Sequence, residues 1–241
     1  MSIPARDRLI VALDFPKIEA AREFARGLGP AVSFYKIGLE LVLSGGLELA
    51  RQLAGEGKQV FLDMKLLDIE NTVARATRSA AVTGATFLTV HAHDSKTLRA
   101  AVSGKAGSTL KLLGVTVLTN LDETDLAEQG VAGTSEEVVL RRARIARAAG
   151  CDGVVASGQE AAHVRGAVGH DMTIVTPGIR LPDEDAGDQA RIVTPQEAIA
   201  AGADYLVVGR PITAAREPRA AVETFVQAID EAMALRSLGS E

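Results

Sequence analysis

Short apolar runs alternate with longer segments of helical spacing along the whole chain. The runs are three to seven residues long and predict eight buried strands, at 9–13, 32–37, 60–64, 87–90, 112–118, 153–156, 173–175 and 205–208. Segments rich in Ala, Leu, Glu and Arg lie between them. Their spacing predicts helices that include 18–28, 47–53, 72–83, 136–149, 195–201 and a long final helix over 214–235.

This alternation predicts a (β/α)8 barrel, an α/β fold of the TIM-barrel type. Continuous apolar strands imply a sheet covered on both faces, and eight strand–helix units in 241 residues fit a barrel better than an open doubly wound sheet. Ser135 is typical of a helix start and Gly150 of a helix stop. No linker or low-complexity tract interrupts the pattern, so we expect one domain over residues 1–241.

Composition and charge limit the binding partners and the cellular location that we expect. Hydrophobic residues make up 47% of the chain, and the net charge of -5 gives no reason to expect nucleic acid or an anionic membrane surface. Cys151 is the single cysteine, which excludes an intrachain disulfide. The first residues lack a signal-peptide segment, and no run approaches the ~18 apolar residues of a membrane span. We therefore expect a cytoplasmic protein.

Polar residues stand where several predicted strands end. In barrels of this class the active site lies at the carboxyl ends of the strands. The residues at these positions are Asp14, Lys36, Asp63, Lys65, Thr119, Arg180, Gly209 and Arg210. A single polar strand end is ordinary, but this set predicts one shared site.

Asp63 and Lys65 are two apart on a strand, so their side chains point to the same side. A buried ion pair would be a weak stabilising device, because burying charges is costly. Lys65 as a Schiff-base nucleophile needs the neutral amine, whereas nearby carboxylates favour the charged form, so general acid is the better role. Lys65 should lower the pKa of Asp63, which suits electrostatic work better than general base catalysis.

Motifs over nearly the whole chain resemble those of the orotidine 5'-phosphate decarboxylase family. They are Val11-Ala12-Leu13-Asp14, Lys36-Ile37-Gly38, the run from Asp63-Met64-Lys65-Leu66-Leu67-Asp68 to Thr72, Gly114 to Thr119, Thr176-Pro177-Gly178-Ile179-Arg180, Gly187-Asp188-Gln189 and Val208-Gly209-Arg210-Pro211-Ile212. The Asp-x-Lys-x-x-Asp motif alone is also similar to that of hexulose-phosphate synthases and keto-gulonate-phosphate decarboxylases. Two positions depart from the family pattern, with Leu67 where histidine is common and Glu70 where proline is common.

The resemblance implies decarboxylation of orotidine 5'-phosphate to UMP, the last step of de novo pyrimidine synthesis, with no metal or other cofactor. Lys65 is implied to stabilise the carbanion at C6 and then to protonate it. Asp63 is implied to lie against the departing carboxylate, where like charges repel. Asp68 and Thr72 are implied to reach the ribose of a neighbouring subunit, which makes the active unit a homodimer.

The remaining contacts implied by the resemblance surround the nucleotide. Asp14 and Lys36 are expected on the ribose and Thr119 on the pyrimidine edge. The phosphate is expected on Gly209, Arg210, Gln189 and Arg180, in keeping with the phosphate sites of barrels near strands 7 and 8. The polar loop 181–191 is either a lid that closes on the phosphate or a surface loop.

The His91/His93 pair and Cys151 are further positions with possible chemistry. His91-x-His93 could suggest a metal pair, but no further ligands join it, so we interpret these residues as site lining and expect no metal. Cys151 opens a strand and is interpreted as a small core residue.

Two other functions are alternatives to the decarboxylase. One is a Mg2+-dependent sugar-phosphate lyase or aldolase on the same barrel, and the other is a non-catalytic phosphoribosyl-binding barrel.

Overall fold

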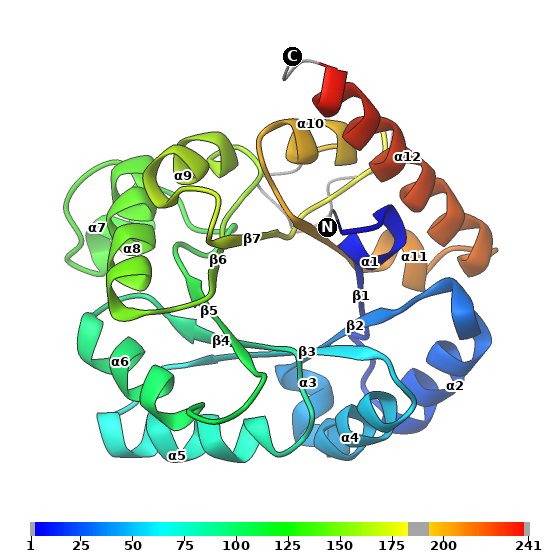
Figure 1. Cartoon of the computed structure of the whole chain (residues 1–241), viewed down its shortest axis with the longest axis horizontal. Helices are drawn as coiled ribbons and strands as arrows, with labels where there is room; N and C mark the ends of the chain where they lie inside the picture. The colour runs from blue at the N-terminus through cyan, green and yellow to red at the C-terminus, as the bar shows by residue number, and fades with distance from the viewer. Residues whose placement is uncertain (1–2, 183–192, 239–241) are drawn as a thin grey trace.

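The computed structural model describes residues 3–182 and 193–238, and its strands close into a barrel (Figure 1). All eight strands are parallel and neighbour one another in chain order, with the last paired to the first. They are β1 Leu9–Ala12, β2 Phe34–Gly38, β3 Gln59–Leu66, β4 Phe87–His91, β5 Lys111–Val115, β6 Gly153–Val155, β7 Thr173–Thr176 and β8 Tyr205–Val208. The predicted (β/α)8 barrel is confirmed.

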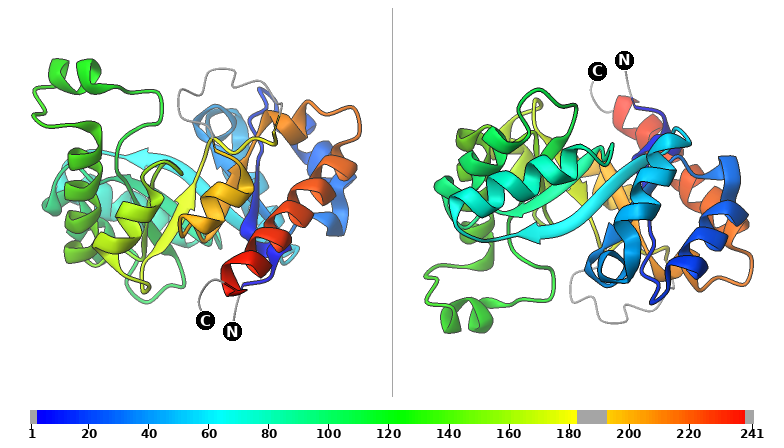
Figure 2. Two further views of the ribbon diagram at one scale, coloured as in Figure 1. Left: turned by 90° about the horizontal axis from the view of Figure 1, so that it is seen from above. Right: turned by 90° about the horizontal axis from the view of Figure 1, so that it is seen from below.

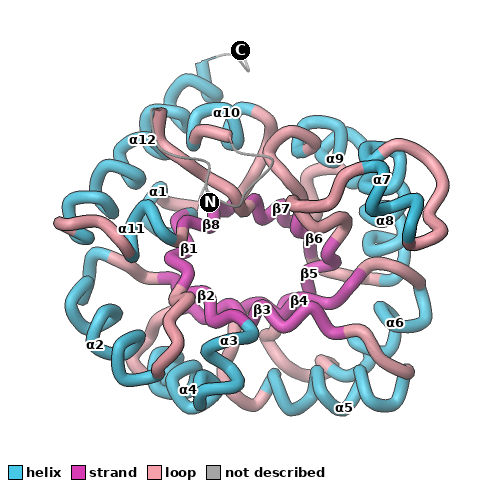
Figure 3. The backbone as a smooth tube through the Cα atoms, turned by 180° about the vertical axis from the view of Figure 1, so that it is seen from behind, coloured by secondary structure: helices cyan, strands magenta, loops and turns pink. Residues whose placement is uncertain are grey.

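Helices form a ring outside the strands, which Figure 3 shows from the opposite end of the barrel. The α-helices are α1 Ala5–Arg8, α2 Ile18–Leu28, α3 Leu39–Leu41, α4 Leu47–Gly55, α5 Glu70–Ala81, α6 Ser95–Gly104, α7 Glu123–Glu128, α8 Ser135–Ala149, α9 Ala161–Val168, α10 Pro195–Ala200, α11 Arg210–Thr213 and α12 Pro218–Leu238. Two short turns, η1 Gly29–Ala31 and η2 Val42–Gly46, complete the described helical elements. No helix in the described ranges is both long enough and apolar enough to cross a membrane.

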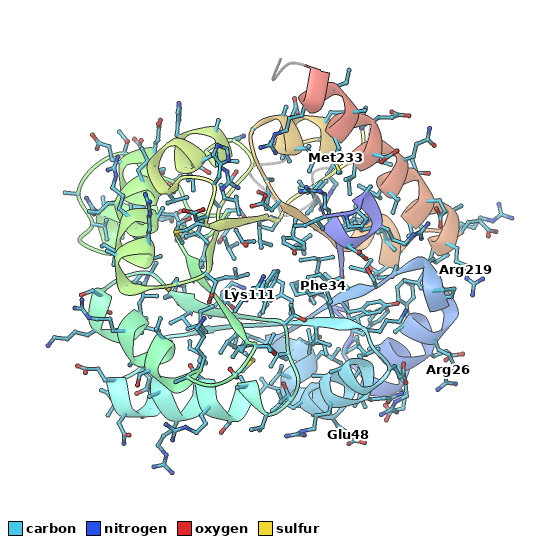
Figure 4. All side chains as sticks on the ribbon, viewed as in Figure 1. Arg26, Phe34, Glu48, Lys111, Arg219 and Met233 are labelled. Carbon is cyan, nitrogen blue, oxygen red and sulfur yellow. The ribbon has the colours of Figure 1, made fainter. Side chains whose placement is uncertain are left out.

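Apolar side chains pack in two separate layers. The larger layer lies between the strands and the helices. The smaller layer fills the inside of the barrel and consists of Ile10, Ala12, Phe34, Phe61, Phe87, Leu113, Val175, Tyr205 and Val207. The ring of Phe34 lies within the circle of strands (Figure 4). The rings of Phe34, Phe87 and Tyr205 all contact one another, at centroid distances of 5.1, 5.2 and 5.7 Å. This aromatic plug closes the barrel interior beneath the carboxyl ends of the strands.

The structure corrects several predicted boundaries. The final helix, predicted over 214–235, is present as the single helix α12, but its start is wrong, because α12 begins only at Pro218, whose fixed φ suits the first turn of a helix. Helix α8 does start at Ser135 as predicted, but the capping side chain is that of Thr134. Gly150 ends α8 in the left-handed conformation, with φ of 89°, as expected of a glycine stop.

Strands β2 and β5 are also shifted from the predicted ranges. β2 begins two residues later than predicted, and β5 ends at Val115 rather than at 118. Val117 and Leu118 line the cavity at the mouth of the barrel, whereas Thr116 is buried and donates to the Val155 carbonyl just beyond the end of the strand pairing. The chain that follows β5 carries α7 away from the barrel (Figure 2).

Candidate active site

A cavity of about 480 Å³ opens at the carboxyl ends of the strands. Eight of the predicted site residues line it, namely Asp14, Lys36, Asp63, Lys65, Thr119, Arg180, Gly209 and Arg210. They come from β2 and β3 and from the segments that follow β1, β5, β7 and β8. Closure of the barrel therefore brings together residues that are up to 196 positions apart in the chain.

Four of these side chains form a row of alternating charge. The Lys36 ammonium lies 2.9 Å from Asp14 and 3.8 Å from Asp63. Asp63 in turn lies 2.8 Å from the Lys65 ammonium. Burial alone raises the pKa of Asp63, but the two lysines and its hydrogen bonds outweigh that effect and hold the pKa below its ordinary value. The row is thus built from charged groups, with Lys36 and Asp63 each between two opposite charges.

The backbone of β3 is irregular where it presents this pair. Leu62 pairs with Leu88 and Leu66 with Val90, so three residues of β3 lie opposite a single residue of β4. Within the irregular stretch Lys65 has a φ of 47°, in the left-handed region that a non-glycine residue rarely adopts. The predicted alternation nevertheless holds, because Asp63 and Lys65 line the cavity whereas Met64 packs on the outer core.

The side of the cavity after β7 and β8 carries two guanidinium groups. Arg180 is buried and donates from Nη1 to the Ile179 carbonyl at 2.9 Å. Arg210 begins the short helix α11 directly after Gly209. Gln189 and most of the loop 181–191 lie outside the described residues.

The cavity also has an apolar wall that sequence reasoning did not identify. Its members are Ala12, Phe61, Val115, Val117, Leu118, Val155, Pro177 and Val207. Such a wall suits one face of a flat, partly apolar ring. These wall residues appear in the sequence as small and branched apolar residues at strand ends. Every buried strand shows the same pattern, so the pattern does not distinguish a cavity wall from ordinary core.

Two predicted residues do not line the cavity of their own chain. Asp68 is exposed, and its Oδ1 accepts a hydrogen bond from the Ile69 N–H at 2.6 Å. Thr72 is exposed in the first turn of α5. Exposed apolar side chains flank Asp68, since Leu67 is 52% exposed and Ile69 is 73% exposed.

The histidine pair lies beside the charged row. The His91 and His93 rings are 4.7 Å apart. Burial, together with the charges of His93, Lys65 and Arg142, lowers the pKa of His91 to about 4. No group of three potential metal ligands occurs in the described part of the chain. Cys151 is buried, and burial raises the pKa of its thiol to about 12, so it packs as a core residue.

A closed parallel barrel with a charged cavity at the carboxyl ends of its strands defines the class of (β/α)8 barrel enzymes. Comparison with known proteins then identifies the family. Residues 7–225 match the family model described as "Orotidine 5'-phosphate decarboxylase / HUMPS family". The chain belongs to this family.

Individual relatives agree with this assignment. The orotidine 5'-phosphate decarboxylase of Rhodopseudomonas palustris strain BisA53 is 55% identical over 227 residues, which cover 94% of this chain and 96% of the relative. That of Bradyrhizobium sp. strain BTAi1 is 55% identical over 97% of this chain and 96% of its own. A crystal structure of orotidine 5'-phosphate decarboxylase from Lactobacillus acidophilus superposes with a TM-score of 0.83 at 36% identity, covering 93% of this chain and 99% of that one.

Proposed function

We propose that this chain decarboxylates orotidine 5'-phosphate to UMP in pyrimidine biosynthesis, with no metal or other cofactor. The observation that carries the proposal is the Asp63–Lys65 pair, 2.8 Å apart inside the cavity, in a chain whose relatives are named orotidine 5'-phosphate decarboxylases. The apolar wall suits the pyrimidine, and the guanidinium groups of Arg180 and Arg210 suit the phosphate.

The chemistry rests on the charges around C6 of the substrate. Asp63, whose pKa is held low, stays ionised and repels the substrate carboxylate, and that repulsion ends when neutral CO2 departs. The electron pair of the broken C–C bond remains at C6, where the Lys65 ammonium stabilises it. Lys65 then transfers a proton to C6 to give UMP. The neutral amine regains a proton from solvent before the next turnover.

The other residues hold the nucleotide. Asp14 and Lys36 contact the ribose hydroxyls and Thr119 the pyrimidine edge, while Arg180, Gln189, Gly209 and Arg210 bind the phosphate. Phosphate binding far from C6 supplies binding energy that helps to assemble the site.

A second subunit completes each site in this proposal. Asp68 and Thr72 are exposed and do not line the cavity of their own chain, and Leu67 and Ile69 beside Asp68 are exposed too, so a homodimer that buries these residues can place Asp68 on the partner's ribose. The dimer is thus part of the proposed active unit.

The test is the loss of absorbance of orotidine 5'-phosphate on incubation with the protein, before and after exhaustive chelation. The wild type should turn over at the same rate in both cases. The Lys65→Ala variant should lose about 10²- to 10⁴-fold in kcat, because it lacks the proton donor, and should still bind UMP.

Lys111→Ala is the matched control, because Lys111 is exposed at the amino end of β5 and should not affect the rate. Activity that disappears on chelation and returns with Mg2+ would instead support the metal-dependent lyase. Nucleotide binding without any turnover by the wild type would support a binding protein.

A further inference from the structure

Thr89 lies in the middle of β4, directly behind the charged row. The residue is fully buried and does not line the cavity. Its hydroxyl oxygen accepts a hydrogen bond from the Lys65 backbone N–H at 2.9 Å and donates to Asp63 Oδ1 at 2.9 Å. Because an N–H can only donate and an ionised carboxylate can only accept, both partners together determine the orientation of the hydroxyl.

The hydroxyl occupies the point where the strand pairing is irregular. Regular pairing stops at Leu62–Leu88 and resumes at Leu66–Val90, and Thr89 is the β4 residue between these two pairs. Lys65 is turned into the left-handed region at this point, and its N–H is directed to the Thr89 side chain. One hydroxyl group thus holds both the backbone of Lys65 and the carboxylate of Asp63.

The contact also determines how the Asp63 carboxylate is oriented. Oδ1 accepts from Thr89, and Oδ2 faces Lys65 at 2.8 Å and Lys36 at 3.8 Å. With both oxygens engaged, rotation of the carboxylate would break at least one charge-assisted hydrogen bond. Asp63 is therefore held in one orientation before a substrate enters.

We propose that Thr89 is a positioning residue, which sets the geometry of the Asp63–Lys65 pair through its hydroxyl group. The inference rests on the proposed function, since it assigns Thr89 an effect on decarboxylation by way of Asp63. It requires the hydroxyl and not merely the β-branched shape, because the contacts that carry it are the two hydrogen bonds.

A second threonine on the same strand pair provides a matched control. Thr86 precedes β4, and its hydroxyl accepts the Val60 N–H at 3.4 Å near the amino end of β3. This contact resembles that of Thr89 with the Lys65 N–H, but it involves no residue of the charged row. Any general effect of losing a threonine hydroxyl from this strand pair should therefore occur in Thr86→Val as well.

The experiment compares Thr89→Val, Thr89→Ser and Thr86→Val. Thr89→Val should lower kcat by about 10- to 100-fold, the size expected for losing a hydrogen bond to a charged group, and should change UMP affinity by less than about 3-fold. Thr89→Ser should restore kcat to within about 3-fold of the wild type, and Thr86→Val should keep the wild-type rate. Wild-type kcat in Thr89→Val, or failure of serine to restore it, overturns the proposal.

A double-mutant cycle tests whether Thr89 acts through Asp63. In an Asp63→Asn background, Thr89→Val should cost less in turnover than in the wild type, because the charge-assisted hydrogen bond to the carboxylate is already gone and only the contact with the Lys65 N–H remains to be lost. An undiminished loss in that background contradicts the proposal.

A measurement that does not depend on catalysis distinguishes failure of this inference from failure of the proposed function. The Asp63 carboxyl group can be titrated by carbon NMR in wild type and in Thr89→Val, with Lys36, Lys65, Asp14 and His91 as the titratable neighbours in both. Loss of the Thr89 hydrogen bond should raise the titration midpoint of Asp63, and an unchanged midpoint overturns the positioning role. If the wild type shows no decarboxylation, the proposed function fails and the titration alone decides the role of Thr89.

Discussion

The imidazole of His91 ends β4 beside the charged row, and its Nδ1 atom is buried with no hydrogen-bond partner among the described residues. Because burial and nearby cations lower its pKa to about 4, the ring is neutral at physiological pH. It therefore adds no positive charge that would compete with Lys65 for Asp63.

The shifted pKa of His91 predicts a pH dependence of stability. An unfolded histidine binds a proton near pH 6.5 and the folded one only near pH 4, so His91 should contribute to stability above pH 6.5 and lose that contribution as the pH falls towards 4. Chemical unfolding of wild type and His91→Gln at pH 7.5 and 4.5 measures the effect. The wild type should lose more free energy of unfolding than the variant between pH 7.5 and 4.5, and equal losses would contradict the lowered pKa of His91.

At the residue scale, local strand geometry determines which side chains share a face but not which groups they contact. The period of two along a strand places Asp63 and Lys65 on one side, and the structure agrees. The contact of Thr89 with both residues could not be predicted, because it depends on an irregular β3–β4 register that leaves no mark in the pattern of apolar residues.

At the scale of elements, the strands and most of the proposed helices follow from apolar spacing. The boundaries that failed share a cause, which is that an apolar residue can face a cavity or a loop as well as a sheet. Val117 and Leu118 line the mouth of the barrel instead of extending β5. Helix α12 begins at Pro218 and not at 214, because apolar spacing alone does not show where the chain between α11 and α12 turns.

Packing between neighbouring helices can be tested with two glycines. Gly104 ends α6 against α5, where an added Cβ would collide with the Ala74 carbonyl oxygen, whereas an added Cβ on Gly166 in α9 would meet no atom within 4 Å beyond its chain neighbours and the backbone of its own helix. Gly104→Ala should lower the free energy of unfolding by about 1–3 kcal/mol through overpacking. Gly166→Ala should raise it by about 0.5–1 kcal/mol through helix propensity.

Denaturant unfolding of both variants against wild type measures these changes. The change in the free energy of unfolding should have opposite signs in the two variants, although both replace glycine by alanine. A stabilised Gly104→Ala would show that the α5–α6 approach is not the controlling factor, and a destabilised Gly166→Ala would contradict the expected gain from helix propensity.

At the scale of the whole molecule, barrel closure explains why the site residues could be predicted without knowing their contacts. Any residue just past the carboxyl end of a parallel strand lies at the same rim, so Asp14, Thr119 and Arg210 meet around one cavity. Asp68 and Thr72 could not be assigned by this rule. They follow β3 but lie outside the cavity, and only the family resemblance suggested a role for them in a second subunit.

That role in a second subunit predicts complementation between inactive chains. Lys65→Ala lacks the proton donor and Asp68→Ala lacks the residue proposed to act on the partner's site. In a mixed dimer of the two, one site combines the intact Lys65 of one chain with the intact Asp68 of the other, and the second site carries both defects. If the chains assort at random, half of the dimers are mixed, so about a quarter of all sites should be active.

Mixing Lys65→Ala with Asp63→Asn is the control for this experiment. Asp63 and Lys65 belong to the same cavity, so every site of that mixed dimer retains one defect and no activity should return. Native mass spectrometry establishes that mixed dimers have formed in both cases. If the Lys65→Ala and Asp68→Ala chains form mixed dimers that stay inactive, Asp68 does not serve the partner's site. Recovery in that pair and not in the control places Asp68 on the opposite subunit from the Lys65 that it assists.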